Sequence, residues 1–237
     1  MKIIVNADDF GISSHVNNAI YQTMIEKHIS STTIMAVGDY VDEAIEMTKE
    51  FNDISFGVHL VYDGPFTFLT EESKGIGYNN NNIINIKGLN FSKVDLIYNE
   101  FCAQIEKVKN LGVSVSHIDT HHHLHLYPIV LAAAIKAANT YNITKIRTQK
   151  LLVGSLPNKI YRTLHHKVTD IFNIHQPSYY TDFPTLLKSE ILEDDTFNGV
   201  IEVMCHPGSK YNDEQYFNDN VYASIKNKMI NYNQFNN

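Results

Sequence analysis

Residues 116–125 read Ser-His-Ile-Asp-Thr-His-His-His-Leu-His and hold five of the twelve histidines of the chain. The β-branched run 113–118 that leads into them predicts a strand, and residues 128–138 after them predict a helix. In α/β proteins the ligand site lies at the carboxyl ends of the strands, where such a turn falls. This stretch therefore predicts an α/β fold and a metal site beside its fourth strand.

Strands and helices alternate on both sides of this stretch. The other predicted strands cover residues 3–6, 32–37, 54–60, 145–147 and 199–205. Predicted helices cover about 15–27, 39–50, 92–108, part of 156–172 and 221–230. Residues 61–90, with an Asn-rich run at 78–85, are expected to be either an irregular functional loop near the site or partly disordered, and residues 176–184 are expected to form a second loop. The pattern predicts a single domain over 1–237 with parallel strands, either doubly wound or barrel-like.

Composition argues against several classes of binding partner and indicates the cellular compartment. The net charge is −7 and the basic residues form no long block, which argues against nucleic acid and against an anionic membrane. No apolar run has the roughly 20 residues of a membrane span, and none resembles a secretory signal. The two cysteines form neither a disulfide framework nor a zinc motif, so we expect a cytoplasmic protein.

Unusual polar residues follow almost every predicted strand. They are Asp8 and Asp9 after the first strand, His59 at the third, His121 to His125 after the fourth, Arg147 after the fifth and His206 after the last. Because the carboxyl ends of parallel strands share one face, we expect these side chains to converge on one site.

These residue types indicate the chemistry of a metal-dependent hydrolase. One carboxylate and two imidazoles can hold a divalent ion that keeps positions open for water and substrate. The pair Asp8 and Asp9 offers one carboxylate for the ion and one to take a proton from water. His206 could protonate a leaving group, and Arg147 could orient a carboxylate or hold a ligand oxygen. We expect amides or esters as substrates.

Each motif also has a purely structural interpretation. Asp8-Asp9 could be a turn or a helix cap, His59 a hydrogen-bonded core residue, and the turn at His206 only a turn. The histidine run is harder to explain structurally. Not all of its histidines can be ligands, because in an extended chain His121, His123 and His125 would point to one side and His122 to the other. Asp119 is expected to orient a ligating imidazole rather than to bind the ion.

Four ordered motifs resemble the YdjC-type carbohydrate deacetylases: residues 5–11 (VNADDFG), 57–60 (GVHL), 117–125 (HIDTHHHLH) and 202–208 (EVMCHPG). The resemblance implies a NodB-like, distorted (β/α) barrel that hydrolyses N-acetyl groups of amino sugars or chitooligosaccharides and releases acetate. It also implies a homodimer and a divalent ion, Mg²⁺ in the family.

By the same resemblance, residues Asp9, His59 and His122 would hold the ion, Asp8 would be the general base and His206 the general acid. Arg147 matches the family's arginine, and we expect His121 and His125 to shape the pocket. Two imidazoles and one carboxylate suit Zn²⁺, Mn²⁺ or Co²⁺ better than Mg²⁺. A different metal-dependent hydrolase, an amidohydrolase or phosphoesterase, and a non-catalytic sugar- or metal-binding protein remain alternatives.

Overall fold

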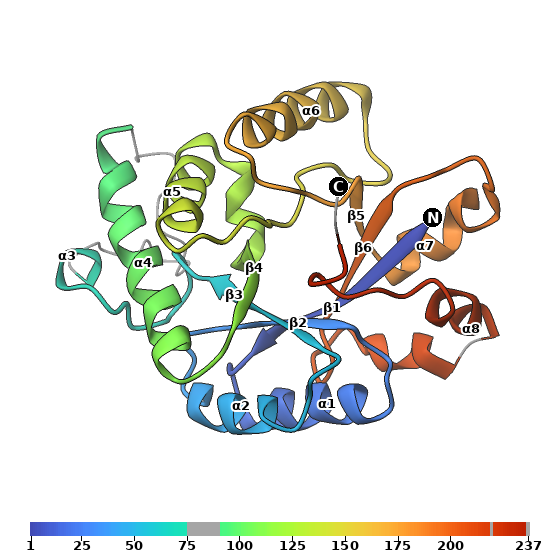
Figure 1. Ribbon diagram of the computed structural model, residues 1–237, viewed down its shortest axis with the longest axis horizontal. Helices are drawn as coiled ribbons and strands as arrows, with labels where there is room; N and C mark the ends of the chain where they lie inside the picture. Colours follow the sequence, from blue (N-terminus) through green and yellow to red (C-terminus); the bar gives the residue numbers. More distant parts are fainter. Residues whose placement is uncertain (75–90, 219, 236–237) are drawn as a thin grey trace.

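The first strand, β1 (Lys2–Phe10), lies inside a parallel sheet, and Ile3 to Asp8 are all buried. The structure is a computed structural model that describes residues 1–74, 91–218 and 220–235. Apolar and β-branched residues dominate β1 because both faces of a parallel strand are covered. Figure 1 shows the strands at the centre of the molecule with the helices around them.

The described residues form one six-stranded sheet in the order β4-β3-β2-β1-β6-β5, with every pair parallel. Its other strands are β2 (Ser31–Ile34), β3 (Ser55–Leu60), β4 (Val115–Thr120), β5 (Tyr179–Asp182) and β6 (Val200–Cys205). The two edge strands are joined through one irregular segment, since Ile146 bridges to Ile118 of β4 and Leu151 bridges to Tyr180 of β5. The sheet is thus a distorted barrel closed by isolated bridges.

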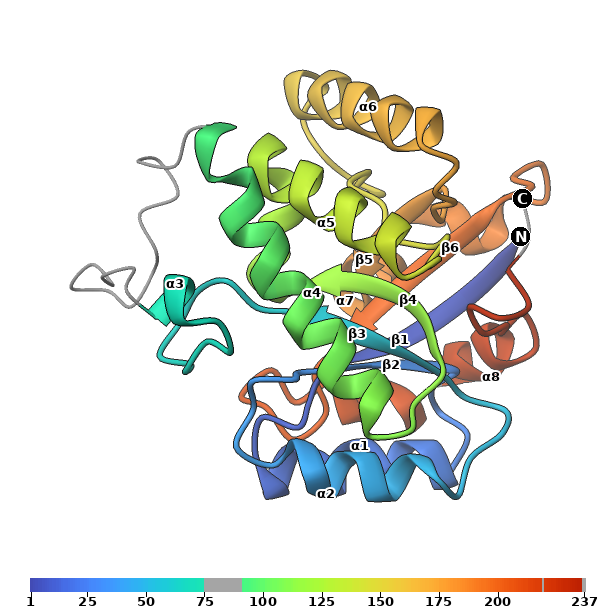
Figure 2. The same ribbon diagram turned by 60° about the vertical axis from the view of Figure 1, so that its left-hand side comes forward.

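The helices surround this barrel. They are α1 (Ser14–Ile25), α2 (Val41–Thr48), α3 (Glu71–Lys74), α4 (Val94–Asn110), α5 (Pro128–Thr140), α6 (Leu156–Ile171), α7 (Phe183–Lys188) and α8 (Asn220–Lys226). Helices α1 and α2 pack together on one side, and α4 packs against α5 on another (Figures 1 and 2). Among the described residues, none of these helices combines the length and the apolar character needed to cross a bilayer.

The C-terminal segment covers the amino ends of the strands. Met229 bridges to Ile3 of β1, and the backbone N–H of Tyr232 donates to Ser55 Oγ of β3. The Tyr232 ring stacks on His117 of β4 with 3.7 Å between ring centroids. This segment therefore closes the barrel opposite the carboxyl ends of its strands.

The predicted α/β fold, single domain and parallel strands are confirmed. Two local predictions were wrong: residues 179–182 form β5 where a loop was expected, and residues 145–147 make only isolated bridges where a strand was expected. Strand β5 forms because its backbone pairs with β6, which its short sequence does not reveal. In the expected loop 61–90, the described part contains α3, and the Asn-rich run at 78–85 lies outside the described residues.

Candidate active site

A cavity of about 460 Å³ lies at the carboxyl ends of the strands. Its lining residues are Asp8, Asp9, His59, His121, His122, His123, Asp182, Pro184, Met204, His206, Tyr211, Asp213 and Tyr216. The structure therefore brings together the strand-end residues of β1, β3, β4 and β6, as the sequence predicted. Arg147, Asp119 and His125 do not line this cavity and are fully buried.

Asp9, His59 and His121 form a candidate metal site whose three side chains all line the cavity. Their ligand atoms lie within 4.8 Å of one another. Asp9 Oδ1 is 3.3 Å from His59 Nε2 and 3.3 Å from His121 Nδ1. These atoms are one carboxylate oxygen and two ring nitrogens, which is a donor set that divalent transition ions accept.

The orientation of His59 suits a ligand. Its Nδ1 lies 2.7 Å from Asp119 Oδ1, so an Nδ1 proton is donated to that carboxylate and Nε2 faces Asp9. Thr33 Oγ1 donates to the second oxygen of Asp119 and fixes the carboxylate in turn. Burial lowers the pKa of His59, but the charge and hydrogen bond of Asp119, together with Asp9 and Asp8, outweigh burial and raise this pKa well above its usual value. The raised pKa means that Nε2 also carries a proton, and a cation bound beside Asp9 would replace that Nε2 proton.

Asp9 provides the test of whether an ion fits. Its Oδ1 is buried and makes no hydrogen bond of good geometry, although two imidazoles lie close to it. Its backbone has φ of 70°, a left-handed conformation that non-glycine residues rarely adopt and that functional sites often contain. A buried oxygen without a full hydrogen-bond partner, beside two ring nitrogens, is what a cation ligand requires. The residues fit a divalent ion.

Asp8 is held by Arg147 beside this group. Arg147 Nη1 donates to Asp8 Oδ2 at 2.7 Å and Nη2 donates to Asp8 Oδ1 at 2.6 Å. Asn6 Nδ2 donates a third hydrogen bond to Asp8 at 2.8 Å. Burial disfavours the carboxylate, but the charge and hydrogen bonds of Arg147 outweigh it and hold the pKa of Asp8 well below its usual range. Asp8 is therefore ionised and fixed in direction.

Arg147 connects Asp8 to the floor of the barrel. Its Nη2 lies 2.9 Å from Asp119 Oδ2, and its Nε donates to Glu202 Oε1 at 2.8 Å. Tyr232 of the C-terminal segment donates to the other oxygen of Glu202 at 2.7 Å. Three carboxylates compensate one buried guanidinium, and each is further hydrogen-bonded. Arg147 thus positions carboxylates, one of the two roles that the sequence suggested.

His206 lies on the other side of Asp8. Its Nε2 is 3.8 Å from Asp8 Oδ2, and its Nδ1 is 3.7 Å from Asp213 Oδ2. Asp213 also accepts a hydrogen bond from the backbone N–H of His206 at 2.8 Å. Burial lowers the pKa of His206. The nearby carboxylates, chiefly Asp213 and Asp8, raise it by a larger amount, so the net shift is upward. A protonated imidazole beside an ionised carboxylate can donate a proton to a leaving group.

The remaining histidines of the run have different environments. His122 lies outside the Asp9 group, and its Nδ1 is 2.6 Å from Asp63 Oδ2, which is the main reason that its pKa is raised. Burial lowers the pKa of His123 to about 3. His125 is buried, with Nδ1 2.6 Å from Thr120 Oγ1. The prediction that His122 is a metal ligand stays a prediction, and the geometry favours His121.

Four residues in or around the site were not predicted from the sequence: Asp63, Asp213, Glu202 and Tyr232. Glu202 carried a signal, because a charged residue interrupts the otherwise apolar strand β6 and must be paired if buried. Asp63 follows His59 by four residues, and its partner is 59 positions away, so no local pattern indicates the pair.

A parallel barrel with carboxylates and imidazoles at the carboxyl ends of its strands suits a metal-dependent hydrolase. The model of the YdjC-like protein family matches residues 2–233 of this sequence. The chain belongs to the YdjC-like family.

Named relatives agree with this family, and a solved structure shares the fold. The carbohydrate deacetylase of Clostridium beijerinckii is 30% identical over 224 residues, covering 94% of this chain and 87% of the relative. The carbohydrate deacetylase of Vibrio parahaemolyticus is 31% identical over 229 residues, covering 94% and 84%. The crystal structure of an Enterococcus faecalis protein, put forward as a cellobiose-phosphate cleavage protein, superposes with a TM-score of 0.76. It is 24% identical and covers 98% of this chain and 97% of its own, which shows the shared fold.

Proposed function

We propose that the chain is a metal-dependent carbohydrate deacetylase that removes N-acetyl groups from acetylated amino sugars or chitooligosaccharides and releases acetate. The observation that carries this proposal is the meeting of Asp8, Asp9, His59 and His206 in one cavity. The relatives named carbohydrate deacetylase, which align over most of the chain, support the substrate class.

We propose Asp9, His59 and His121 as the residues that hold the ion. A divalent ion there supplies Lewis acidity, which makes a water molecule more acidic and an amide carbonyl more electrophilic. The family resemblance favours Mg²⁺, whereas two imidazoles favour Zn²⁺, Mn²⁺ or Co²⁺. Activity of metal-stripped protein, restored with each ion in turn, tests this choice. We expect a transition ion to restore the most activity, and full activity with Mg²⁺ alone would contradict that expectation.

The chain's own residues move the protons. Asp8 accepts a proton from the attacking water, since it is ionised and Arg147 fixes its direction. A low pKa makes Asp8 a weak base. Proton transfer to Asp8 therefore depends on the fixed position of its carboxylate beside the water and on the lowered pKa of that water. The water oxygen bonds to the acetyl carbon, and His206 donates a proton to the sugar nitrogen as the C–N bond breaks. The products are acetate and a free amine.

Two other functions compete with deacetylation. A different metal-dependent hydrolase on the same barrel, such as an amidohydrolase or a phosphoesterase, would use the same ligands on another bond. A non-catalytic sugar- or metal-binding protein would need Asp9 and the histidines but not an ionised Asp8 held in place by Arg147. The fixed carboxylate favours an enzyme.

Acetate release from a panel of N-acetylhexosamines and chitooligosaccharides tests the proposal. We expect release with at least one sugar, and we expect Asp8→Asn to abolish turnover while the protein keeps its metal. If wild-type protein releases acetate from no sugar in the panel, the substrate class is wrong. If Asp8→Asn leaves the function of the wild-type protein unchanged, Asp8 is not the base.

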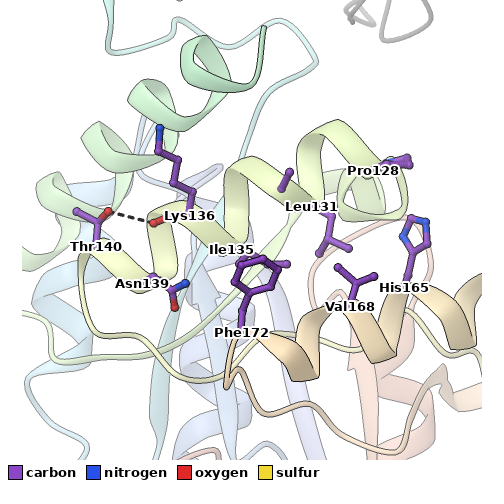
Figure 3. A pocket seen from close by; sticks show the side chains of 10 residues that line it. Pro128, Leu131, Ile135, Lys136, Asn139, Thr140, His165, Val168 and Phe172 are labelled. Carbon is purple, nitrogen blue, oxygen red and sulfur yellow. Dashed lines mark hydrogen bonds between the residues drawn. The ribbon is translucent and has the colours of Figure 1, made fainter. Parts of the chain in front are cut away.

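We also propose that two chains form a homodimer through an apolar face of α6. The exposed residues of this face are Ile160, Leu164, Val168, Ile171 and Phe172. A groove of about 730 Å³ runs between α5 and α6, and Figure 3 shows Val168 and Phe172 opposite Leu131 and Ile135. Apolar patches of several hundred Å² on a surface commonly mark an interface. A second copy of this face is the occupant that we propose.

Sedimentation velocity over a range of protein concentrations tests the dimer. We expect wild-type protein to sediment as a dimer and Leu164→Asp to sediment as a monomer, because a charge would be buried in the interface. Ile25→Asp is the matched control, since Ile25 is an exposed apolar residue of α1. A wild-type monomer at all concentrations would contradict the proposal.

We propose a reducing compartment, the cytoplasm, for this chain. Cys102 and Cys205 are free thiols. Cell fractionation with an antibody against the chain tests this proposal.

A further inference from the structure

Asp63 and His122 form a pair at the edge of the cavity that the proposed reaction does not use. His122 Nδ1 lies 2.6 Å from Asp63 Oδ2. The His122 side chain is 64% exposed and lines the cavity, while the Asp63 side chain is only 2% exposed. The His122 ring lies 3.9 Å from the ring of His121, next to the proposed ion. The pair therefore borders the place where the acetyl group must react.

The strand register explains why these residues meet. Leu60 at the end of β3 pairs with Thr120 at the end of β4, so the residues that follow each strand leave the barrel side by side. Asp63 follows β3 and His122 follows β4. Burial of the Asp63 carboxylate is unfavourable unless it is paired, and His122 supplies that partner. The buried Asp63 carboxylate therefore holds the exposed His122 ring in place.

The backbone at His122 is held in an unfavourable conformation. His122 and His123 have φ of 49° and 54°, in the left-handed region. Such conformations persist when the surroundings impose them, and they occur often at ligand sites. In this left-handed turn the His122 ring lies against Asp63, and His122 is not among the three residues of the Asp9 group. Because Nδ1 faces Asp63, the Nε2 edge is the part of the ring left to meet a ligand in the cavity.

We propose that His122 Nε2 hydrogen-bonds the sugar next to the reacting acetyl group and that Asp63 is the positioning residue that holds His122 there. This inference rests on the proposed deacetylase function. An imidazole with one nitrogen fixed can exchange a directed hydrogen bond with a sugar hydroxyl through the other nitrogen. The pair sets how the sugar is held and takes no part in bond breaking.

A metal role is the competing explanation, since ligand atoms of Asp63, His121 and His122 also lie within 4.8 Å of one another. The variants Asp63→Asn, His122→Asn and the double variant separate the two roles. Asparagine tolerates the left-handed backbone at position 122, so His122→Asn removes the imidazole with little strain. The measurements are KM and kcat for acetate release from N,N′-diacetylchitobiose, and Zn²⁺ affinity of the metal-stripped protein. Asp194→Asn, which removes an exposed carboxylate elsewhere, is the control.

We expect each single variant to raise KM about tenfold, equivalent to about 1.4 kcal/mol, with kcat and Zn²⁺ affinity nearly unchanged. Because Asp63 acts through His122, the double variant should raise KM no more than His122→Asn alone. Zn²⁺ affinity reduced tenfold or more in His122→Asn would make His122 a ligand and overturn the inference. Unchanged KM, or additive effects in the double variant, would overturn it as well.

The inference remains testable if one variant does not fold, and its failure can be told apart from failure of the proposed function. If Asp63→Asn unfolds, His122→Asn still tests the sugar contact, because the His122 side chain is largely exposed. If wild-type protein releases no acetate from this sugar or from the wider panel, the proposed function fails and the inference with it. Active wild-type protein with an unchanged KM in His122→Asn contradicts the inference alone.

Discussion

Arg147 is the residue on which the geometry of the proposed site most depends. Its guanidinium is fully buried and grips Asp8 through two nitrogens while a third donates to Glu202. A lysine keeps the charge but cannot form these directed bonds together. We expect Arg147→Lys to lower kcat for acetate release at least about tenfold and to destabilise the fold by roughly 2–4 kcal/mol. Urea unfolding and the acetate assay measure both.

Arg162→Lys is the matched control for this substitution. Arg162 Nη1 makes two long hydrogen bonds, each 3.3 Å, to Gln149 O and the Tyr180 hydroxyl. We expect only a small loss of stability and unchanged kcat. If Arg147→Lys behaves in the same way, the bidentate contact with Asp8 has no role in turnover.

Single residues were predictable from the sequence where chemistry and strand ends coincide. Asp8, Asp9 and His59 stand out because polar side chains directly follow or end apolar strands. The choice between His121 and His122 could not be made in this way, since it depends on a left-handed turn that extended alternation does not anticipate. Asp63 stayed hidden because its partner comes from the neighbouring strand.

At the scale of elements, β3 and β4 pack closely only because position 57 is glycine. A Cβ at Gly57 would lie 2.6 Å from His117 Cε1, and the same ring is stacked on Tyr232 with 3.7 Å between ring centroids. The ring cannot retreat, so we expect Gly57→Ala to destabilise the fold by about 1–3 kcal/mol. Gly154→Ala, with no atom within 4 Å of its Cβ, should change stability by less than about 0.5 kcal/mol. Equal unfolding midpoints for the two variants would contradict this.

Elements differed in how far the sequence determined them. Long periodic helices such as α4 and apolar strands such as β6 follow from local pattern, because burial of one face or of both faces dictates it. Strand β5 has four residues and forms through pairing with β6, so only tertiary structure defines it. The reverse holds for residues 145–147, whose strand-like composition ends in isolated bridges because the barrel closes irregularly there.

At the scale of the whole molecule, the buried histidines make stability depend on pH. Burial lowers the pKa of His117 and His125 well below the usual 6.5, and that of His123 to about 3. Below pH 6.5 the unfolded chain binds protons at these positions and the folded chain does not, so acid favours unfolding. The folded state therefore has its full stability with respect to these three histidines above pH 6.5, and it loses stability as the pH falls below that value. His59 has a raised pKa and acts oppositely, since its contribution is lost as the pH rises above 6.5.

The stability of the metal-free protein should therefore pass through a maximum near pH 6.5, the ordinary pKa of histidine. The loss of stability on the acid side of this maximum can be traced to individual buried histidines. Each buried neutral histidine adds up to about 1.4 kcal/mol per pH unit to the slope between about pH 5 and 6. His117→Gln removes one such group, so its unfolding free energy should fall with acid less steeply than that of wild type by about this amount. Its overall stability will also drop, because the stacked ring is lost, but the slope is independent of that offset. His15→Gln removes an exposed histidine and should leave the slope unchanged. Urea unfolding at several pH values measures the slopes, and equal slopes for His117→Gln and wild type would show that His117 takes up its proton in the folded state as readily as in the unfolded chain.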